Sequence, residues 1–354
     1  MTSKKYALTL AGLLFVFFCL NFILWHFMVK TLYINDNGHG DLSRIENFFT
    51  TEPITHQASY FKRHTEFQNY IKSSSTKNFD VITIGDSFSN GQGGCFYQDY
   101  LTDKYNLEIL NIQMGEFNSL EMLYALDYSG WLDELKPRFA ILESVERACN
   151  ESFGLREIKL NDDKLKLSHE QIFKMTNSKD NKTDFKKIFP SVMVKANIKF
   201  LRANFSRLKN LNPYITKLNQ PMFTNPGQED LLLFLDGDLG YLEKPFNAEQ
   251  INKNFNDAEK YFASKGVKII FMPCVDKFNL YYPYIENNKY PHENNFFDEI
   301  EKLDKNYTLI NTKKILRKLL AQGEKDVYWL DDTHWSWKAQ QAVGDEIAKI
   351  ILSN

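Results

Sequence analysis

Short apolar runs alternate along the chain with stretches in which apolar residues recur at helical spacing. Strand-like runs are predicted at residues 80–85, 107–113, 138–145, 267–275 and 307–312. Amphipathic helices are predicted around residues 118–135, 248–265, 293–305 and 338–352. Continuous apolar strands separated by such helices indicate a parallel sheet that is covered on both faces. The pattern therefore predicts an α/β fold of three layers, α/β/α.

The first apolar run differs from the others in its length. Residues 6–29 contain no Asp, Glu, Lys or Arg and follow Lys4 and Lys5. A bilayer core of about 30 Å needs about 20 apolar residues, and Trp25 and Lys30 are suitable interfacial anchors. A cleaved signal peptide has a shorter apolar region and a small-residue cleavage site, which is not seen here. We expect an uncleaved transmembrane anchor at 1–30, with the following domain outside the cytoplasmic membrane.

Three further regions complete the predicted organisation. Residues 31–78 are a polar connector with one amphipathic helix around 58–72, packed on the domain or on the membrane. Residues 79–354 form the main domain. Within it, residues 151–245 interrupt the strand–helix rhythm and are rich in Lys and Asn, so they are interpreted as an insertion. Such inserts either cap the substrate crevice or elaborate the surface.

Composition excludes some functions and leaves others open. The formal net charge of −2 provides no basic footprint for nucleic acid. No Cys/His cluster has zinc-ligand spacing, and nothing in the sequence requires a metal or a cofactor. Cys95 and Cys149 both follow predicted strands at the same end of the sheet, so they form either a disulfide or two buried free thiols, and we favour the thiols.

The segment "VITIGDSFSNGQGG" (residues 81–94) is the first candidate for chemistry. A buried strand stops at Gly85, and Ser87 follows where the chain leaves the carboxyl end of the sheet. Ligands of open α/β sheets bind in that crevice, so Ser87 is a candidate nucleophile. A polar turn without chemistry is the alternative.

The segment "VYWLDDTHWSW" (residues 327–337) is the second candidate. His334 precedes the last helix, and Asp331 and Asp332 stand three and two positions before it. A carboxylate that orients an imidazole is the arrangement of a general base, although a lone His334 would more often be a surface residue. An exposed serine after the first strand and an Asp/His pair before the last helix together favour a Ser-His-Asp site.

Only one of the two aspartates can orient His334. In extended chain, residues two apart share a face, which favours Asp332. Helical spacing would select Asp331 instead. We expect Asp332.

The two motifs resemble those of a known superfamily. "GDSFSNG" looks like the first block of the SGNH hydrolases, and "DDTHW" looks like their last block in the form found in the alginate O-acetyltransferase group. The resemblance covers about residues 78–150 and 265–352. The order of Ser first and Asp/His last follows the superfamily, whereas the alginate enzymes place Asp-His before Ser. The resemblance implies a flavodoxin-like SGNH sheet.

Site residues are implied one by one by this resemblance. Ser87 is the nucleophile, Asp332 and His334 complete the triad, and the backbone N–H of Gly115 faces the oxyanion. The third block, usually Gly-x-Asn-Asp, is replaced by "ESVERACN" (residues 143–150). Its Arg147 is expected to position the acyl carbonyl or the glycan, with Glu146 holding the guanidinium. Gly115 as a plain strand-exit glycine and Arg147 as a surface ion pair are the alternatives.

The expected function combines the triad with the anchor. We expect a membrane-anchored, extracytoplasmic O-acyltransferase, most often an acetyltransferase in such proteins, that modifies an envelope polysaccharide. Its acyl donor would be a membrane-bound O-acyltransferase. A carbohydrate esterase of the same fold and a non-catalytic polysaccharide-binding partner of the acyltransferase are the alternatives. Tyr328, Trp335 and Trp337 either stack on a sugar ring or pack the last helix, and packing is preferred.

Overall fold

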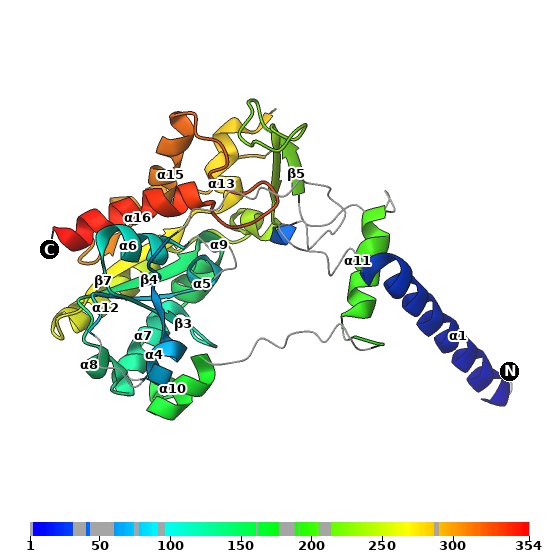
Figure 1. Ribbon diagram of the computed structural model, residues 1–354, viewed down its shortest axis with the longest axis horizontal. Helices are drawn as coiled ribbons and strands as arrows, with labels where there is room; N and C mark the ends of the chain where they lie inside the picture. The colour runs from blue at the N-terminus through cyan, green and yellow to red at the C-terminus, as the bar shows by residue number, and fades with distance from the viewer. Residues whose placement is uncertain are drawn as a thin grey trace.

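The computed structural model describes residues 3–30, 40–42, 60–73, 78–90, 96–160, 162–176, 188–190, 192–204, 214–286 and 290–353. Its centre is a parallel sheet of six strands with helices on both sides (Figure 1). The strand order is β1-β3-β2-β4-β7-β8. The strands are β1 (Thr65–Glu66), β2 (Val81–Gly85), β3 (Ile109–Gln113), β4 (Phe139–Val145), β7 (Lys268–Cys274) and β8 (Thr308–Leu309). The predicted α/β fold with a parallel sheet is therefore confirmed.

Apolar side chains explain why β2 and β4 form the middle of the sheet. Every residue of both strands is buried. Val81 pairs with Ile109 of β3 on one side and with Phe139 of β4 on the other. Burying a Val, Ile or Phe side chain contributes about 1.5–3 kcal/mol each, so two covered faces stabilise these strands strongly.

Two groups of helices cover the sheet. On one side α6 and α15 pack against α16, and on the other α7 packs beside α8, and α12 beside α14 (Figure 1). The helices are α6 (Tyr97–Tyr105), α7 (Ser119–Tyr128), α8 (Trp131–Leu135), α12 (Ala248–Ala263), α14 (Phe296–Lys302), α15 (Thr312–Ala321) and α16 (Trp337–Leu352). A stack of Phe255 of α12 on Phe271 of β7, with ring centroids 3.9 Å apart, shows how closely these layers pack.

Short helices begin directly after three strands, all at the carboxyl edge. They are α5 (Ser87–Asn90), α9 (Glu146–Cys149) and α13 (Lys277–Tyr281), and the π-helical turn η2 (Asn150–Gly154) and the 3₁₀ turn η6 (Tyr282–Tyr284) continue two of them. The chain runs from β2 outward to β3 and then back past β2 to β4, so the strand order reverses between β2 and β4. Ligands of open α/β sheets bind at such a reversal.

Two predicted elements are shorter than expected. The helix expected at 58–72 is α4 (Phe67–Ser73), because residues 65–66 pair with β3 as the edge strand β1. The strand expected at 307–312 is only Thr308–Leu309. There the Asn311 side chain accepts a hydrogen bond from Lys314 N and starts α15, a helix that the apolar pattern did not predict.

The region 151–245 carries secondary structure of its own. It contains a two-stranded antiparallel sheet, β5 (Tyr214–Lys217) with β6 (Leu231–Phe234), and the helices η3 (Asp163–Leu165), α10 (His169–Thr176), α11 (Met193–Asn204) and η5 (Asp236–Leu242). The turn η5 contacts α9 and α13 at the carboxyl edge of the large sheet. This part of the insertion therefore borders the predicted site.

An apolar helix projects from the rest of the chain (Figure 1). It consists of α1 (Ser3–Leu24) and the π-helical turn η1 (Trp25–Val29). The most apolar 18-residue window within Lys4–Val29 has a mean hydropathy of 2.5 and is not buried in the protein. Its length and composition suffice to cross a membrane, as the sequence predicts.

Candidate active site at the carboxyl edge of the sheet

Ser87 lies at the turn from β2 into α5 and is exposed. Asp86 fixes this turn in two directions. Its Oδ1 accepts from Phe88 N at 3.2 Å, and its Oδ2 accepts from Val145 N at the end of β4 at 2.8 Å. A side chain in place of Gly85 would collide with the carboxyl group of Glu143. The turn that presents the serine is thus held between β2 and β4.

Two asparagines hold α5 from its other side. Asn90 Nδ2 donates to Gly85 O at 2.7 Å, and Asn90 Oδ1 accepts from Asn111 Nδ2 at 2.6 Å. Asn111 Oδ1 in turn accepts from Thr83 Oγ1 at 2.9 Å. Because Asn111 and Thr83 are buried in β3 and β2, the short helix is connected to the rigid centre of the sheet.

His334 forms a directed pair with Asp332. Its Nδ1 lies 2.6 Å from Asp332 Oδ1, which also accepts from His334 N at 2.9 Å. This contact makes Nδ1 the protonated nitrogen of the neutral ring, so Nε2 is an acceptor. Nε2 is buried and has no hydrogen-bond partner among the described residues. A base with a free lone pair is the result.

The serine turn and the histidine loop pack against each other. The ring of Phe88, the residue after Ser87, lies 5.1 Å from the ring of His334 and 4.9 Å from that of Trp335. Ser336 begins α16 by accepting a hydrogen bond from Lys338 N. The structure therefore brings the turn that carries Ser87 next to the loop that carries Asp332 and His334, although Ser87 and Asp332 stand 245 positions apart.

Electrostatics favour a protonatable imidazole beside an ionised carboxylate. Burial lowers the pKa of His334, but the hydrogen bond and charge of Asp332 outweigh it and raise this pKa above its usual 6.5. Burial raises the pKa of Asp332, and the contact with His334 outweighs that effect and lowers it below 3.8. The same contact thus stabilises the imidazolium that forms when His334 takes a proton.

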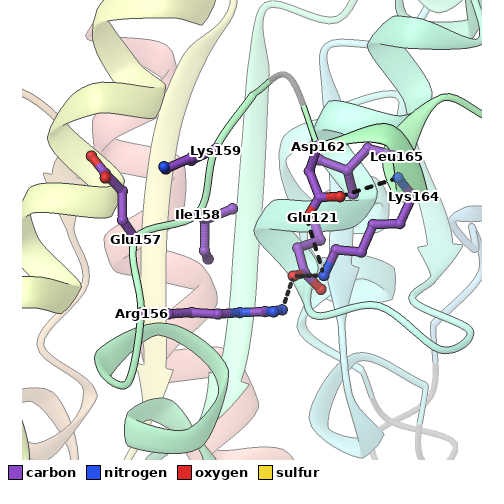
Figure 2. Close-up of a pocket in the computed structure, with 8 residues that line it drawn as sticks. All are labelled: Glu121, Arg156, Glu157, Ile158, Lys159, Asp162, Lys164 and Leu165. Atoms are coloured by element: carbon purple, nitrogen blue, oxygen red, sulfur yellow. Dashed lines mark hydrogen bonds and ion pairs between the residues drawn. The ribbon is translucent and has the colours of Figure 1, made fainter.

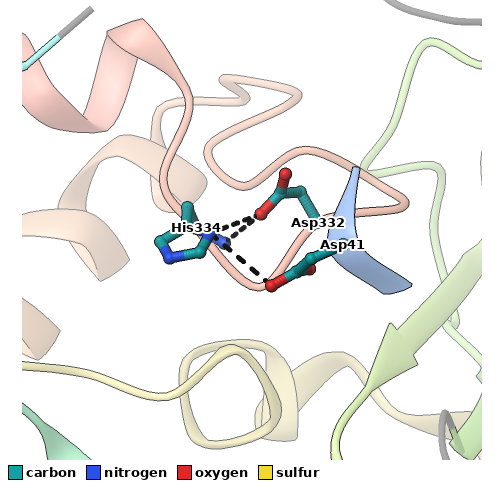
Figure 3. Close-up of side chains that lie close together, drawn as sticks. All are labelled: Asp41, Asp332 and His334. Atoms are coloured by element: carbon teal, nitrogen blue, oxygen red, sulfur yellow. Dashed lines mark hydrogen bonds and ion pairs between the residues drawn. The ribbon is translucent and has the colours of Figure 1, made fainter. Parts of the chain in front are cut away.

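A second carboxylate, Asp41, was missed by sequence reasoning. It lies in the predicted connector, and its Oδ2 is 3.7 Å from His334 Nδ1 (Figure 3). Its Oδ1 accepts from Thr333 N at 2.8 Å, and its Oδ2 accepts from the Thr333 hydroxyl. Burial and the charge of Asp332 raise the pKa of Asp41. It therefore secures the loop between Asp332 and His334 and adds charge beside the base.

The neighbours of Asp41 dock on the other aspartate of the motif. Gly40 N donates to Asp331 Oδ2 at 3.0 Å, and Leu42 N donates to Asp331 O at 2.9 Å. A side chain at position 40 would collide with the backbone of Asp331. Asp331 therefore binds the segment 40–42, while Asp332 contacts the imidazole.

Lys277 was also missed by sequence reasoning, and its side chain supports the loop that carries Asp332. Its buried ammonium donates to Trp329 O at 2.7 Å, Leu330 O at 2.6 Å and Asp332 O at 3.1 Å. Burial lowers its pKa to about 8, against the opposing effect of neighbouring aspartates. All three ammonium protons have acceptors, so Lys277 is a structural support for the loop that carries Asp332.

Asp41, Asp332 and His334 also have ligand atoms within 4.8 Å of one another, the types that bind cations. Hydrogen bonds to Thr333 and His334 already account for both carboxylates. These contacts are those of a histidine oriented by a carboxylate, and the three residues by themselves are not evidence for a bound metal ion.

Arg147, at the start of α9 beside the end of β4, is held differently from the prediction. Its Nη1 lies 2.5 Å from Asp276 Oδ1 and 3.3 Å from Asp238 Oδ1, and these charges raise the guanidinium pKa against the effect of burial. Glu146, expected to hold it, instead accepts from Asp276 N at 2.8 Å and from Asn279 Nδ2 at 2.6 Å. The expected Glu146–Arg147 pair is wrong because the Glu146 side chain is buried under α13.

Gly115 follows β3 at the same edge and has a φ of +62°. A side chain there would collide with Met175 of α10. Backbone conformation and packing thus both explain this glycine. Its predicted role at an oxyanion stays a prediction.

Two of the three aromatic residues near His334 pack inside the domain, and the third, Trp337, is half-buried. Tyr328 and Trp335 are buried, and Trp335 Nε1 donates to Tyr328 Oη at 2.8 Å. Neither ring is available to a sugar. Cys149 is a buried free thiol, whereas Cys95 and the glycines of residues 91–94 lie outside the described residues.

A hollow of about 230 Å³ lies between the start of α7 and the chain after η2 (Figure 2). Ser87, Asp332 and His334 are not among its lining residues. Glu121 is buried in its wall and pairs with Arg156 and Lys164, each at 2.6 Å. The charge of this carboxylate is therefore matched by its own neighbours.

No protein-family model matches the chain, and no curated protein matches it at a significant level.

Proposed function

We propose that this protein is a membrane-anchored serine O-acyltransferase of SGNH type, acting on an extracytoplasmic polysaccharide. The main support is the 2.6 Å contact of Asp332 with His334 Nδ1, which leaves Nε2 as an unpartnered acceptor beside the turn of an exposed serine. The order β3-β2-β4-β7-β8 within the sheet is the flavodoxin-like one, and Ser before His along the chain is the order that the SGNH resemblance implies.

Proton transfer begins the proposed reaction. Ser87 Oγ rotates toward His334 Nε2, gives up its proton and attacks the acyl carbonyl carbon. Asp332 stabilises the imidazolium. The N–H groups of Ser87 and Gly115 donate to the oxyanion, each being worth about 3 kcal/mol in such sites. When the bond to the donor's leaving group breaks, His334 returns the proton to that group, leaving an acyl-serine.

The second half of the proposed reaction transfers the acyl group. A sugar hydroxyl gives its proton to His334 Nε2 and attacks the acyl-serine, and the imidazolium then reprotonates Ser87. Arg147, between Asp238 and Asp276 with a quarter of its side chain exposed, would bind the acyl carbonyl or the glycan. No cofactor takes part in these steps.

The predicted membrane anchor supports an extracytoplasmic location of the domain and a membrane-bound acyl donor. Lys4 and Lys5 before an apolar span favour a cytoplasmic N-terminus and an extracytoplasmic domain. On that side of the membrane cytoplasmic acyl-thioesters are absent, so a membrane-bound O-acyltransferase would supply the acyl group.

Acyl-enzyme formation tests the proposal. The full-length protein in detergent, treated with an activated acetyl ester, should carry acetyl on the Ser87 peptide by mass spectrometry. Ser87→Ala should abolish this adduct. Ser264→Ala, which alters an exposed serine on the far end of α12, should leave it unchanged. Absence of the adduct in the wild-type protein would favour the non-catalytic alternative.

Acceptor dependence separates transferase from esterase. A transferase should release little acetate until a polysaccharide or oligosaccharide acceptor is added, and the acceptor should then become acetylated. Rapid release of acetate to water, unchanged by acceptors, would make the protein an esterase.

A further inference from the structure

The helix α11 packs on the end of the apolar helix that is nearer to the folded domain (Figure 1). Met193 and Ala196 of α11 form a small core with Trp25 and Val29 of η1. Asn197 Nδ2 donates to Asn21 O at 2.8 Å. These contacts place α11 across the last turns of the predicted span.

The preceding turn adds to the same junction. His26 Nε2 lies 3.0 Å from Ile188 O, and the ring of Phe189 lies 5.7 Å from that of Phe22. Ile188 and Phe189 are nevertheless 64% and 55% exposed. Two large apolar side chains thus stand in the open beside the end of the span.

A second face of α11 is apolar and exposed. Ile198 and Leu201 are 44% and 39% exposed, and they are three positions apart, on one side of the helix. Met193 and Ala196 are buried against η1, and Val192, Val194 and Phe200 pack on the same cluster. Ile198 and Leu201 do not belong to that cluster, so packing against η1 does not explain why they are apolar.

A basic residue stands beside the apolar face, because Lys195 is exposed on the same helix. Exposed apolar residues with a basic residue next to them are typical of helices that lie in the surface of a membrane. The basic residues of such helices meet phosphate groups of the lipid headgroups.

We propose that α11, with Ile188 and Phe189, lies in the headgroup layer of the phospholipid bilayer that α1 crosses. The apolar face inserts Ile198 and Leu201 among the upper acyl chains, and Lys195 meets lipid phosphate. The contact with η1 identifies the bilayer as the partner of this face. Because η1 is the end of the predicted span, α11 is held at the depth at which the span leaves the bilayer. The inference depends on α1 spanning the membrane and is independent of acyl transfer.

Depth measurements on the full-length protein in nanodiscs test this inference. A small environment-sensitive fluorescent amino acid is inserted genetically at position 198 or 201, one site per protein. Position 15 in the middle of α1 is the lipid control, and Lys314 on α15 is the water control, since both are exposed in the protein. Nitroxide-labelled phospholipids and aqueous iodide are the two quenchers.

Lipid contact predicts strong nitroxide quenching at 198 and 201, approaching that at 15. It also predicts iodide quenching several-fold weaker than at 314. Iodide access at 198 and 201 equal to that at 314 would overturn the proposal. Protection from both quenchers would overturn it as well, because protein rather than lipid would then cover the face. Neither readout requires catalytic activity, so failure here is distinct from failure of the acyltransferase proposal.

Discussion

The two ring nitrogens of His334 have different surroundings, and this difference is what makes the residue a candidate general base. Nδ1 faces two carboxylates, Asp332 at 2.6 Å and Asp41 at 3.7 Å, whereas Nε2 has no partner among the described residues. A merely structural histidine usually has both nitrogens satisfied, as His64 does between Asp99 and Glu66.

Replacement of the two neighbouring aspartates should have unequal effects. Asp332→Asn should lower acyl transfer by about 10³–10⁴-fold, the size expected when the orienting carboxylate of a serine triad is lost. Asp331→Asn should be much milder, because Asp331 binds Gly40 N and not the imidazole. Steady-state kinetics of both variants measure this. A severe defect in Asp331→Asn beside near-normal Asp332→Asn would contradict the assignment.

Asp41→Asn should change the pH profile rather than the fold. Its negative charge helps raise the pKa of His334, and the base is active only when neutral. Activity therefore rises with pH through a pKa above 6.5, and removing the charge should move this rise in activity to lower pH. The profile of kcat/KM against pH is the measurement. Asp133→Asn, at an exposed site, should not move it, and an upward shift in Asp41→Asn would contradict the charge argument.

Short-range motifs singled out Ser87, Asp332 and His334 as candidates, because Ser87 closely follows a buried strand and the Asp-Thr-His sequence closely precedes the last helix. Asp41 and Lys277 could not be found that way. Asp41 contacts Thr333 across 292 positions, and Lys277 contacts Asp332 across 55. An aspartate in a polar connector and a lysine near a tyrosine-rich helix carry no local sign of such contacts.

The loop 329–334 is held by the ammonium group of Lys277. Lys277→Met keeps the aliphatic stem and leaves three carbonyl groups of this loop without their donor. Because misplacement of a catalytic group by about 1 Å can cost 10²-fold, activity should fall by about tenfold or more.

Thermal unfolding should show that Lys277→Met is still folded. Lys338→Met is the matched control, since Lys338 bonds Glu324 and Lys325 O at the surface. It should change the free energy of unfolding by less than about 0.5 kcal/mol. Full activity of Lys277→Met would show that Lys277 is not needed to position the loop that carries Asp332.

His64, which directly precedes the edge strand β1, bonds Asp99 with one ring nitrogen and Glu66 of β1 with the other. Burial lowers the pKa of His64, but Asp99 and Glu66 outweigh it and raise this pKa from 6.5 to about 9. At about 1.4 kcal/mol per pKa unit, the contribution to folding is about 3 kcal/mol. It is fully present below pH 6.5 and lost as pH rises through 9.

Urea denaturation of the wild type and of His64→Gln at several pH values measures this contribution. The advantage of the wild type should shrink between pH 6.5 and 9. An advantage that stays constant over this range would show that His64 is not charged in the folded protein.

Apolar runs predicted the strands well in the middle of the sheet and less well at its edges. β2 and β4 are covered on both faces, so hydrophobicity alone specifies them. β1 and β8 have two residues each and depend on neighbours that are distant in sequence. The sheet β5–β6 was missed because Leu231–Phe234 is almost wholly buried and shows no alternation.

For the whole molecule, the side of the membrane decides which substrates are available. A reporter enzyme that is active only outside the cytoplasm, fused after residue 40, should be active. We expect this because Lys4 and Lys5 precede the apolar run and favour a cytoplasmic N-terminus. Activity of a cytoplasmic reporter at the same position would place the domain inside and remove the polysaccharide as substrate.

The docking of Gly40 and Asp41 beside His334 also limits how far the reaction can occur from the bilayer. Ten peptide units join Lys30 to Gly40, and a fully extended chain covers at most about 3.6 Å per residue, or about 36 Å in all. This distance limits how far Gly40 can lie from Lys30, and His334 lies only the width of the Asp41–Thr333 contact farther on. Under the proposed function, a glycan would be acylated on its membrane-proximal sugars, and polymer that had grown beyond this reach would not be modified.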